Sequence, residues 1–162
     1  MSKGVLYICP TPIGNLEDIT LRTLRILKEV DLIAAEDTRR TLKLLNYYGI
    51  KKSLISYHEH NKVEKGEMLI EKLKEGINIA LVTDAGMPGI SDPGEDMIHL
   101  AIENQMDLVV LPGATASITA LVLSGLPTEK FVFEGFLPSK KKDRREELER
   151  LKTEERTIIL YE

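Results

Sequence analysis

The chain has 162 residues, of which 43% are hydrophobic and 30% are charged, a composition typical of a globular protein of about one domain with a sizeable core. Its formal net charge of −4 argues against a broadly basic coat for nucleic acid, although a local basic patch is compatible with it. No run approaches the roughly 18 apolar residues that a membrane helix needs. Residues 1–8 do not resemble a signal peptide, and the single Cys9 cannot form an intrachain disulfide. These features predict a cytoplasmic protein with no membrane partner.

Apolar segments alternate with amphipathic ones along most of the chain. Short apolar runs predict strands at residues 5–9, 32–35, 53–57, 77–82 and 108–111. A helix follows each strand, and the first is capped by Asp18 or Thr20. Later helices end at the glycines Gly49, Gly76 and Gly125. This alternation is typical of a doubly wound α/β fold with a mainly parallel sheet.

The pattern changes after Pro127. A strand and turn are predicted at residues 131–138, a charged helix at 139–152 and a further strand at 157–161. We therefore predict a complete α/β domain over residues 1–127 and the beginning of a second α/β domain over residues 128–162. The alternative is that the strand at 157–161 adds to the first sheet.

The loop after the fourth strand, residues 83–94, is the most informative part of the chain. It contains two aspartates, three glycines and two prolines. Ligands bind at the carboxyl ends of the strands in such α/β sheets, and glycine lets the backbone approach a ligand closely. A tight strand-to-helix connection has the same composition, so this second interpretation stays open.

Two other loops also follow predicted strands. Residues 10–15 contain no G-x-G-x-x-G fingerprint, and the chain contains no phosphate-binding P-loop motif, which argues against dinucleotide and nucleoside-triphosphate binding. Glu36, Asp37 and Arg39 follow the second strand, where a carboxylate and a guanidinium could orient a polar substrate. The same residues could equally cap a helix and form a salt bridge.

The remaining loops carry histidines and small residues. His58 and His60 suggest general acid–base chemistry or a ribose contact. A metal is not expected there, because no cluster of cysteine or carboxylate ligands completes a site. The small residues at 113–117 would let a ligand approach a helix N-terminus, or would let the helix pack closely on the sheet. Residues 140–152 hold seven basic and four acidic side chains, which indicates a phosphate-contacting patch or a solvated helix face.

Six motifs, in the same order along the chain, resemble one known family. Asp-Ala-Gly-Met-Pro-Gly-Ile-Ser-Asp-Pro-Gly at 84–94 resembles the signature of the ribosomal RNA small subunit methyltransferase I family, within the tetrapyrrole (corrin/porphyrin) methylase superfamily. The other five motifs lie at residues 10–16, 35–39, 57–61, 111–117 and 133–138. The resemblance implies a two-domain, S-adenosylmethionine-dependent homodimer, with the cofactor held between the domains. It also implies 2′-O-methylation of a cytidine ribose in small-subunit (16S) rRNA, with the rRNA or the ribosomal subunit as partner.

The resemblance also implies roles for individual residues. The cofactor-binding residues would be Pro12, Ile13, Gly14, Thr83, Asp84, Gly86, Met87, Ile90, Thr115, Ala116, Phe136 and Leu137. Asp84 would accept hydrogen bonds from the cofactor. The catalytic candidates are Glu36, Asp37 and His58, because a 2′-hydroxyl needs a general base. The RNA-binding candidates are Arg39, Arg40, His60 and Asn61.

Two other functions remain open. The first is methylation of a tetrapyrrole or corrin precursor by an enzyme of the same superfamily. The second is binding without catalysis, because family members continue well past residue 162 and most of the second domain would be missing from this chain.

Overall fold

The computed structural model describes residues 2–162. The chain divides into two compact units, one ending at Ala114 and the other running from Thr115 to Glu162. The predicted domain boundary after residue 127 lies further along the chain. It stays a prediction, because a compact unit of this chain need not coincide with a domain.

A five-stranded parallel sheet forms the centre of the first unit. Its strands are β1 (Val5–Ile8), β2 (Leu32–Ala35), β3 (Ser53–Ser56), β4 (Ile79–Val82) and β5 (Asp107–Val110). They lie in the order β3-β2-β4-β1-β5, and every neighbouring pair is parallel. The predicted doubly wound, parallel α/β fold is therefore confirmed for this unit.

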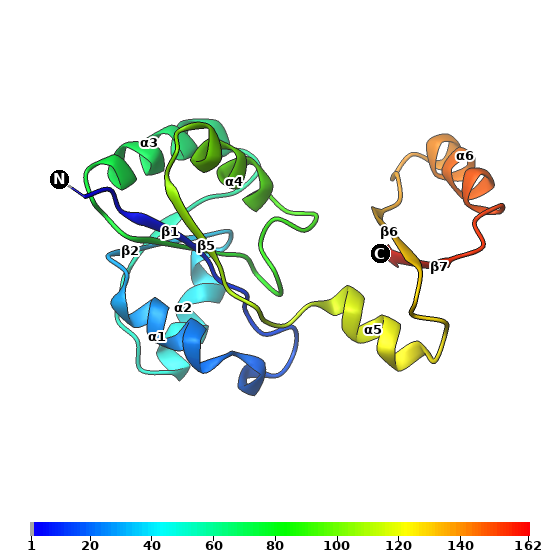
Figure 1. Ribbon diagram of the computed structural model, residues 1–162, viewed down its shortest axis with the longest axis horizontal. Helices are drawn as coiled ribbons and strands as arrows, with labels where there is room; N and C mark the ends of the chain where they lie inside the picture. Colours follow the sequence, from blue (N-terminus) through cyan, green and yellow to red (C-terminus); the bar gives the residue numbers. More distant parts are fainter. Residues whose placement is uncertain (1) are drawn as a thin grey trace. The chain divides into compact units, whose positions relative to one another are not determined.

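Helices cover both faces of this sheet. They are α1 (Leu21–Glu29), α2 (Thr38–Tyr47), α3 (Lys62–Lys74) and α4 (Gly94–Glu103), and the short 3-10 helix η1 (Leu16–Asp18) precedes α1. Figure 1 shows α1 and α2 on one face and α3 and α4 on the other. Thr20, rather than Asp18, caps α1, because the Thr20 hydroxyl accepts the Thr23 N–H at 3.0 Å. Asp18 belongs to η1 instead.

The core lies on both faces of the sheet. Ile79 and Leu81 of β4 pack with α3 and α4, whereas Ala80 and Val82 pack with α1 and α2. All four side chains are buried. A strand that is covered on both faces has no polar side, which is why these strands appear in the sequence as continuous apolar runs.

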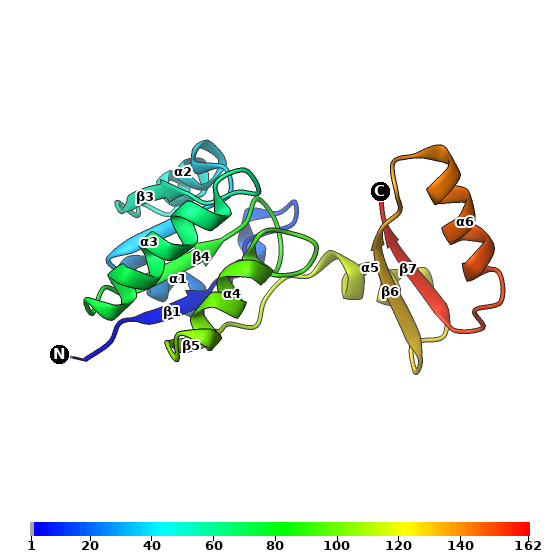
Figure 2. The same ribbon diagram turned by 90° about the horizontal axis from the view of Figure 1, so that it is seen from above.

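The second unit contains α5 (Ala116–Ser124), β6 (Phe131–Phe136), α6 (Lys141–Leu151) and β7 (Thr157–Tyr161). Strands β6 and β7 form a parallel two-stranded sheet, and α6 connects them (Figure 2). The alternative that residues 157–161 add to the first sheet is therefore wrong. Parallel neighbours need a long crossover, and the charged segment supplies one as a helix.

Ion pairs neutralise much of the basic segment. Arg150 pairs with Glu147 and Glu134, Arg144 pairs with Glu162, and Lys142 and Lys152 pair with acidic residues of α6. Over residues 2–162, Lys140, Lys141 and Arg145 have no such partner. No helix in that range combines the length and the apolar character needed to span a bilayer.

Candidate functional site

The strand order creates a ligand-binding position at the carboxyl end of β4. Strand β4 lies between β1 and β2. The chain leaves β1 and β2 toward α1 and α2, but it leaves β4 toward α4 on the opposite face. Adjacent strands whose connections diverge in this way leave a crevice in which ligands of α/β proteins bind. The loops at residues 10–15, 36–37 and 83–94 meet at this position.

Backbone hydrogen bonds join the first and third of these loops. The Thr11 N–H donates to the Gly86 carbonyl and the Gly86 N–H donates to the Thr11 carbonyl, both at 3.0 Å. The buried Thr11 hydroxyl also donates to the Thr83 carbonyl at 3.1 Å. Gly86 has a φ of 83°, a conformation that favours glycine. Ile13 lies against Gly86, with its Cγ2 3.4 Å from the position that a Cβ at residue 86 would occupy. The predicted cofactor residues of the two loops are thus brought together.

Asp84 connects this pair of loops to the start of α2. One carboxylate oxygen accepts the Asp37 N–H at 3.1 Å, and the other lies 3.3 Å from Arg40 Nη1. The Asp84 N–H donates in turn to Glu36 Oε2 at 3.2 Å. The predicted catalytic pair and the predicted cofactor aspartate therefore lie together. The Arg40–Asp84 ion pair joins residues that are far apart in the sequence, so no local pattern indicates it, and the RNA-binding role of Arg40 stays a prediction.

The two carboxyl groups after β2 have different acid strengths. Burial raises the pKa of Glu36 above its usual value, the Asp84 N–H opposes this shift, and the negative charges of Asp84 and Asp92 add to it. The Asp37 carboxylate accepts the Arg39 backbone N–H at 2.9 Å and two hydrogen bonds from the Arg39 guanidinium. The Arg39 guanidinium, together with that N–H, lowers the pKa of Asp37 to about 2. Glu36 is therefore the stronger base of the pair.

The helix cap and the salt bridge that the sequence offered as an alternative role for Asp37 and Arg39 are both present. Asp37 is the N-cap residue of α2. Its side chain is paired with the exposed guanidinium of Arg39. The catalytic role of Asp37 and the RNA-binding role of Arg39 stay predictions.

Asp92 organises the loop after β4, although it is not among the predicted site residues. Its Oδ1 accepts the Gly89 N–H at 2.7 Å and the Gly94 N–H at 2.9 Å. An aspartate that accepts the N–H of the second residue after it forms an Asx turn, and Asp-Pro-Gly was the available sequence signal. Burial raises the pKa of Asp92. The turn holds the segment that begins α4.

Replacing Asp92 by alanine is expected to lower the free energy of unfolding by about 1–3 kcal/mol, because two partly buried N–H groups lose their acceptor. Asp92→Asn keeps an acceptor oxygen. Since burial raises the Asp92 pKa, the stability contributed by its protonated form is lost as the pH rises through that pKa. At neutral pH, Asp92→Asn should therefore unfold at or above the melting temperature of the unchanged protein. Thermal unfolding of both variants tests this, and equal destabilisation of the two would contradict it.

His58, His60 and Asn61 form a separate local group after β3. The His58 N–H donates to Asn61 Oδ1 at 2.8 Å, and the Asn61 amide donates to the Ser56 carbonyl at 3.2 Å. The two imidazole rings lie edge to face, with centroids 5.9 Å apart. Within the described chain, no hydrogen bond links this group to Glu36 or Asp84. The roles of these three residues stay predictions.

The remaining predicted cofactor residues belong to the second unit. Thr115 precedes α5, and Ala116 is its first residue. Phe136 ends β6 and packs edge to face on Tyr161, with centroids 5.4 Å apart. Leu137 follows directly after Phe136. Their cofactor roles stay predictions.

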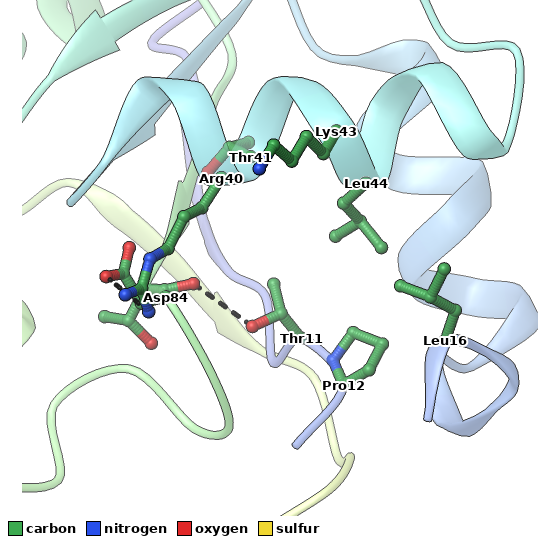
Figure 3. Close-up of a pocket in the computed structure, with 9 residues that line it drawn as sticks. Thr11, Pro12, Leu16, Arg40, Thr41, Lys43, Leu44 and Asp84 are labelled. Carbon is green, nitrogen blue, oxygen red and sulfur yellow. Dashed lines mark hydrogen bonds and ion pairs between the residues drawn. The ribbon is translucent and has the colours of Figure 1, made fainter. Parts of the chain in front are cut away.

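A pocket of about 160 Å³ lies beside Asp84, between the loop after β1 and helix α2. Asp84, Thr11 and Arg40 form one end of the pocket, and Leu16 and Leu44 lie at the other (Figure 3). Figure 3 also shows Arg40 extending from α2 toward Asp84. The pocket therefore has a charged end and an apolar end.

Comparison with known proteins identifies the family. Residues 5–162 match the profile of the Tetrapyrrole (Corrin/Porphyrin) Methylases. A protein from Halalkalibacterium halodurans named ribosomal RNA small subunit methyltransferase I is 58% identical over 160 residues, which cover 99% of this chain and 55% of that protein. The Thermotoga maritima protein of the same name is 50% identical over 159 residues, which cover 98% of this chain and 71% of that protein.

A solved structure shares the fold at much lower identity. Uroporphyrin-III-C-methyltransferase from Thermus thermophilus has a TM-score of 0.62 and 22% identity, over 82% of this chain and 60% of that chain. A second structure of this enzyme, complexed with S-adenyl homocysteine, has a TM-score of 0.60 and 20% identity over 82% of this chain and 59% of that chain. The chain spans about half the length of most of the curated relatives that it matches, 54–57% for the first seven. The chain belongs to the tetrapyrrole methylase family and, within it, to the ribosomal RNA small subunit methyltransferase I family.

Proposed function

We propose that this chain is part of an S-adenosylmethionine-dependent methyltransferase that modifies the ribose 2′-oxygen of a cytidine in small-subunit rRNA. The observation that carries the proposal is the joining of the loops after β1, β2 and β4 around Asp84 and Glu36. The names of relatives at 48–58% identity support rRNA as the substrate. The solved tetrapyrrole enzyme is only 20–22% identical, so the tetrapyrrole alternative has weaker support.

The loops at 10–15 and 83–94 are the proposed cofactor site. The complex of the Thermus enzyme with S-adenyl homocysteine supports a cofactor of this kind for the fold. S-adenosylmethionine carries no phosphate, so the missing glycine-rich phosphate motif is compatible with the site. The glycine at position 86 lets the backbone approach a ligand closely, as the site requires. When bound, the cofactor supplies a methyl group on a positively charged sulfur.

Glu36 is the proposed general base. Transfer forms a bond between the ribose oxygen and the methyl carbon, breaks the carbon–sulfur bond and releases the hydroxyl proton. A base works best when its pKa lies near the working pH. Burial raises the Glu36 pKa, whereas Arg39 lowers the Asp37 pKa to about 2, so Glu36 is the better proton acceptor. Asp37, as the cap of α2, would instead hold the neighbouring backbone in place.

The partners follow from the same proposal. The substrate would be the rRNA or the small ribosomal subunit, which would place the protein in the cytoplasm. A homodimer, as predicted from the family resemblance, is part of the proposal for the whole enzyme. Lys140, Lys141 and Arg145, which form no ion pair within residues 2–162, would contribute a phosphate-contacting surface.

Calorimetric titration with S-adenosylmethionine tests the cofactor site. The unchanged chain should bind, and Asp84→Asn should bind at least about tenfold more weakly, because a charged hydrogen-bond acceptor is lost. The matched control is Asp107→Asn at the exposed amino end of β5, which should bind like the unchanged chain. Equal binding by the two variants would contradict the assignment of Asp84. Absence of binding by a folded, unchanged chain would show that these loops alone do not hold the cofactor.

A further inference from the structure

The pocket beside Asp84 is lined partly by the proposed cofactor loops, through Thr11, Pro12, Thr83 and Asp84, and partly by side chains from other elements. Helix α2 contributes Arg40, Lys43 and Leu44, and η1 contributes Leu16. The Tyr48 hydroxyl donates to the Leu16 carbonyl, which holds η1 against the end of α2. The apolar wall is therefore fixed to the same helix that presents the two cations.

The charges at this pocket favour an anion. Arg40 and Lys43 are both exposed cations, and Asp84 is the one acidic residue among the lining residues. Arg40 forms an ion pair with Asp84, with Nη1 3.3 Å from the carboxylate, but Lys43 forms no ion pair with any of residues 2–162. The Arg40 side chain is 67% exposed, and such surface ion pairs are weak, so its guanidinium can turn to another anion at little cost. A phosphodiester is one of the anions that an exposed arginine and lysine bind, and it is the one that an RNA substrate carries.

The size of the pocket limits what can enter it. Pockets for drug-sized ligands measure about 300–1,000 Å³. The pocket beside Asp84 measures about 160 Å³, which suits one flat base. Proteins that read single-stranded RNA take unstacked bases into such sites and place arginine beside them. Leu16, which is 39% exposed, and the buried Leu44 provide an apolar surface for one face of a base.

We infer that this pocket binds one nucleotide of the acceptor RNA, with its base against Leu16 and Leu44 and an adjacent phosphate on Lys43 and Arg40. The inference rests on the proposed function and names the substrate subsite for it. Glu36 Oε2 accepts the Asp84 N–H at 3.2 Å, so the charged end of the pocket is also the end nearest Glu36, the proposed general base. A nucleotide held this way has its ribose between the base-binding wall and Glu36.

Binding of a fluorescein-labelled single-stranded RNA pentamer with a central cytidine tests the phosphate contact. Lys43→Gln should weaken binding severalfold and reduce the slope of log affinity against log salt by about 0.7, the value for one lost phosphate contact on a single strand. The matched control is Lys51→Gln, an exposed lysine just before β3, at the opposite end of the sheet from the pocket. It should change neither quantity. Equal effects of the two variants would overturn the inference.

A second pair of variants tests the base contact. Leu16→Ala should weaken binding of the cytidine pentamer but not of a pentamer with an abasic central residue. Leu21→Ala, at an 86% exposed position of α1, is the control and should change neither. If Leu16→Ala affects both pentamers equally, the pocket binds no base and the inference fails.

Titration of the unchanged chain with S-adenosylmethionine separates this inference from the proposed function. If the chain binds the cofactor but Lys43→Gln leaves RNA affinity unchanged, the nucleotide subsite is overturned and the proposed methyltransferase function is retained. Lys43-dependent RNA binding without cofactor binding would support the subsite and count against catalysis by this chain.

Discussion

Replacing Glu36 by glutamine is expected to lower the rate of methyl transfer by about 10²–10⁴-fold, the contribution typical of a positioned general base. Glutamine has nearly the same shape, and its side-chain oxygen can still accept the Asp84 N–H that Glu36 Oε2 accepts at 3.2 Å. The loop arrangement and cofactor binding should therefore be retained. The measurement is incorporation of a labelled methyl group into small-subunit rRNA by a protein that carries this chain.

The pH dependence gives the Glu36 prediction a second, independent readout. A base must be deprotonated, so the rate should rise with pH through a Glu36 pKa that burial places above its usual value. In the unchanged protein, the stability contributed by protonated Glu36 is lost as the pH rises through that pKa. Glu36→Gln should therefore unfold at an equal or higher temperature at neutral pH. Glu75→Gln, an exposed position after α3, is the control and should alter neither rate nor pH profile. A full rate in Glu36→Gln would remove Glu36 from the mechanism.

Replacing Gly113 by alanine is expected to lower the free energy of unfolding by about 1–3 kcal/mol, the usual cost of overfilling a packed position. A Cβ at residue 113 would lie 2.2 Å from Pro10 Cγ and 2.8 Å from Pro10 Cβ. The proline ring is short and stiff, so the loop at 10–15 must move. Because that loop is part of the proposed cofactor site, affinity for S-adenosylmethionine should fall as well.

Gly49→Ala separates steric cost from conformational cost. Gly49 has a φ of 63°, but a Cβ there would meet no atom within 4 Å. We expect this control to lower stability by about 1 kcal/mol through backbone strain, and to leave cofactor affinity unchanged. Chemical denaturation and calorimetry measure the two quantities. A Gly113→Ala protein with normal stability and affinity would show that the Pro10 contact does not hold the loop.

The order and type of the elements could be predicted from the sequence because the sheet is covered on both faces. A strand such as β4 is then an unbroken apolar run, and glycines lie within two residues of the ends of α2, α3 and α5. The sequence indicates both Asp18 and Thr20 as possible caps of α1. The hydrogen bond from the Thr23 N–H to the Thr20 hydroxyl identifies Thr20 as the cap. The sequence did not decide whether β7 pairs with β6 or adds to the first sheet, because the periodicity of a strand does not indicate its partner.

The contacts of the site could not be predicted because they join loops distant in the sequence. The Asp37–Asp84 hydrogen bond spans 47 positions and exists because β2 and β4 are neighbours. No local pattern encodes that neighbourhood. The Asp37–Arg39 pair, by contrast, is local, and the sequence did include it as one of two interpretations.

The joining of Thr11 to Gly86 through main-chain atoms has a consequence for how this fold can change in evolution. Neither of these two hydrogen bonds uses a side-chain atom, so exchanging the side chains at positions 12, 13, 87 or 90 leaves both in place. A proline at position 11 or 86 would remove one, because proline has no N–H. Mutations can therefore change which molecule is recognised while the framework that presents it is inherited intact. A single scaffold of this kind can diversify into enzymes with unrelated acceptors.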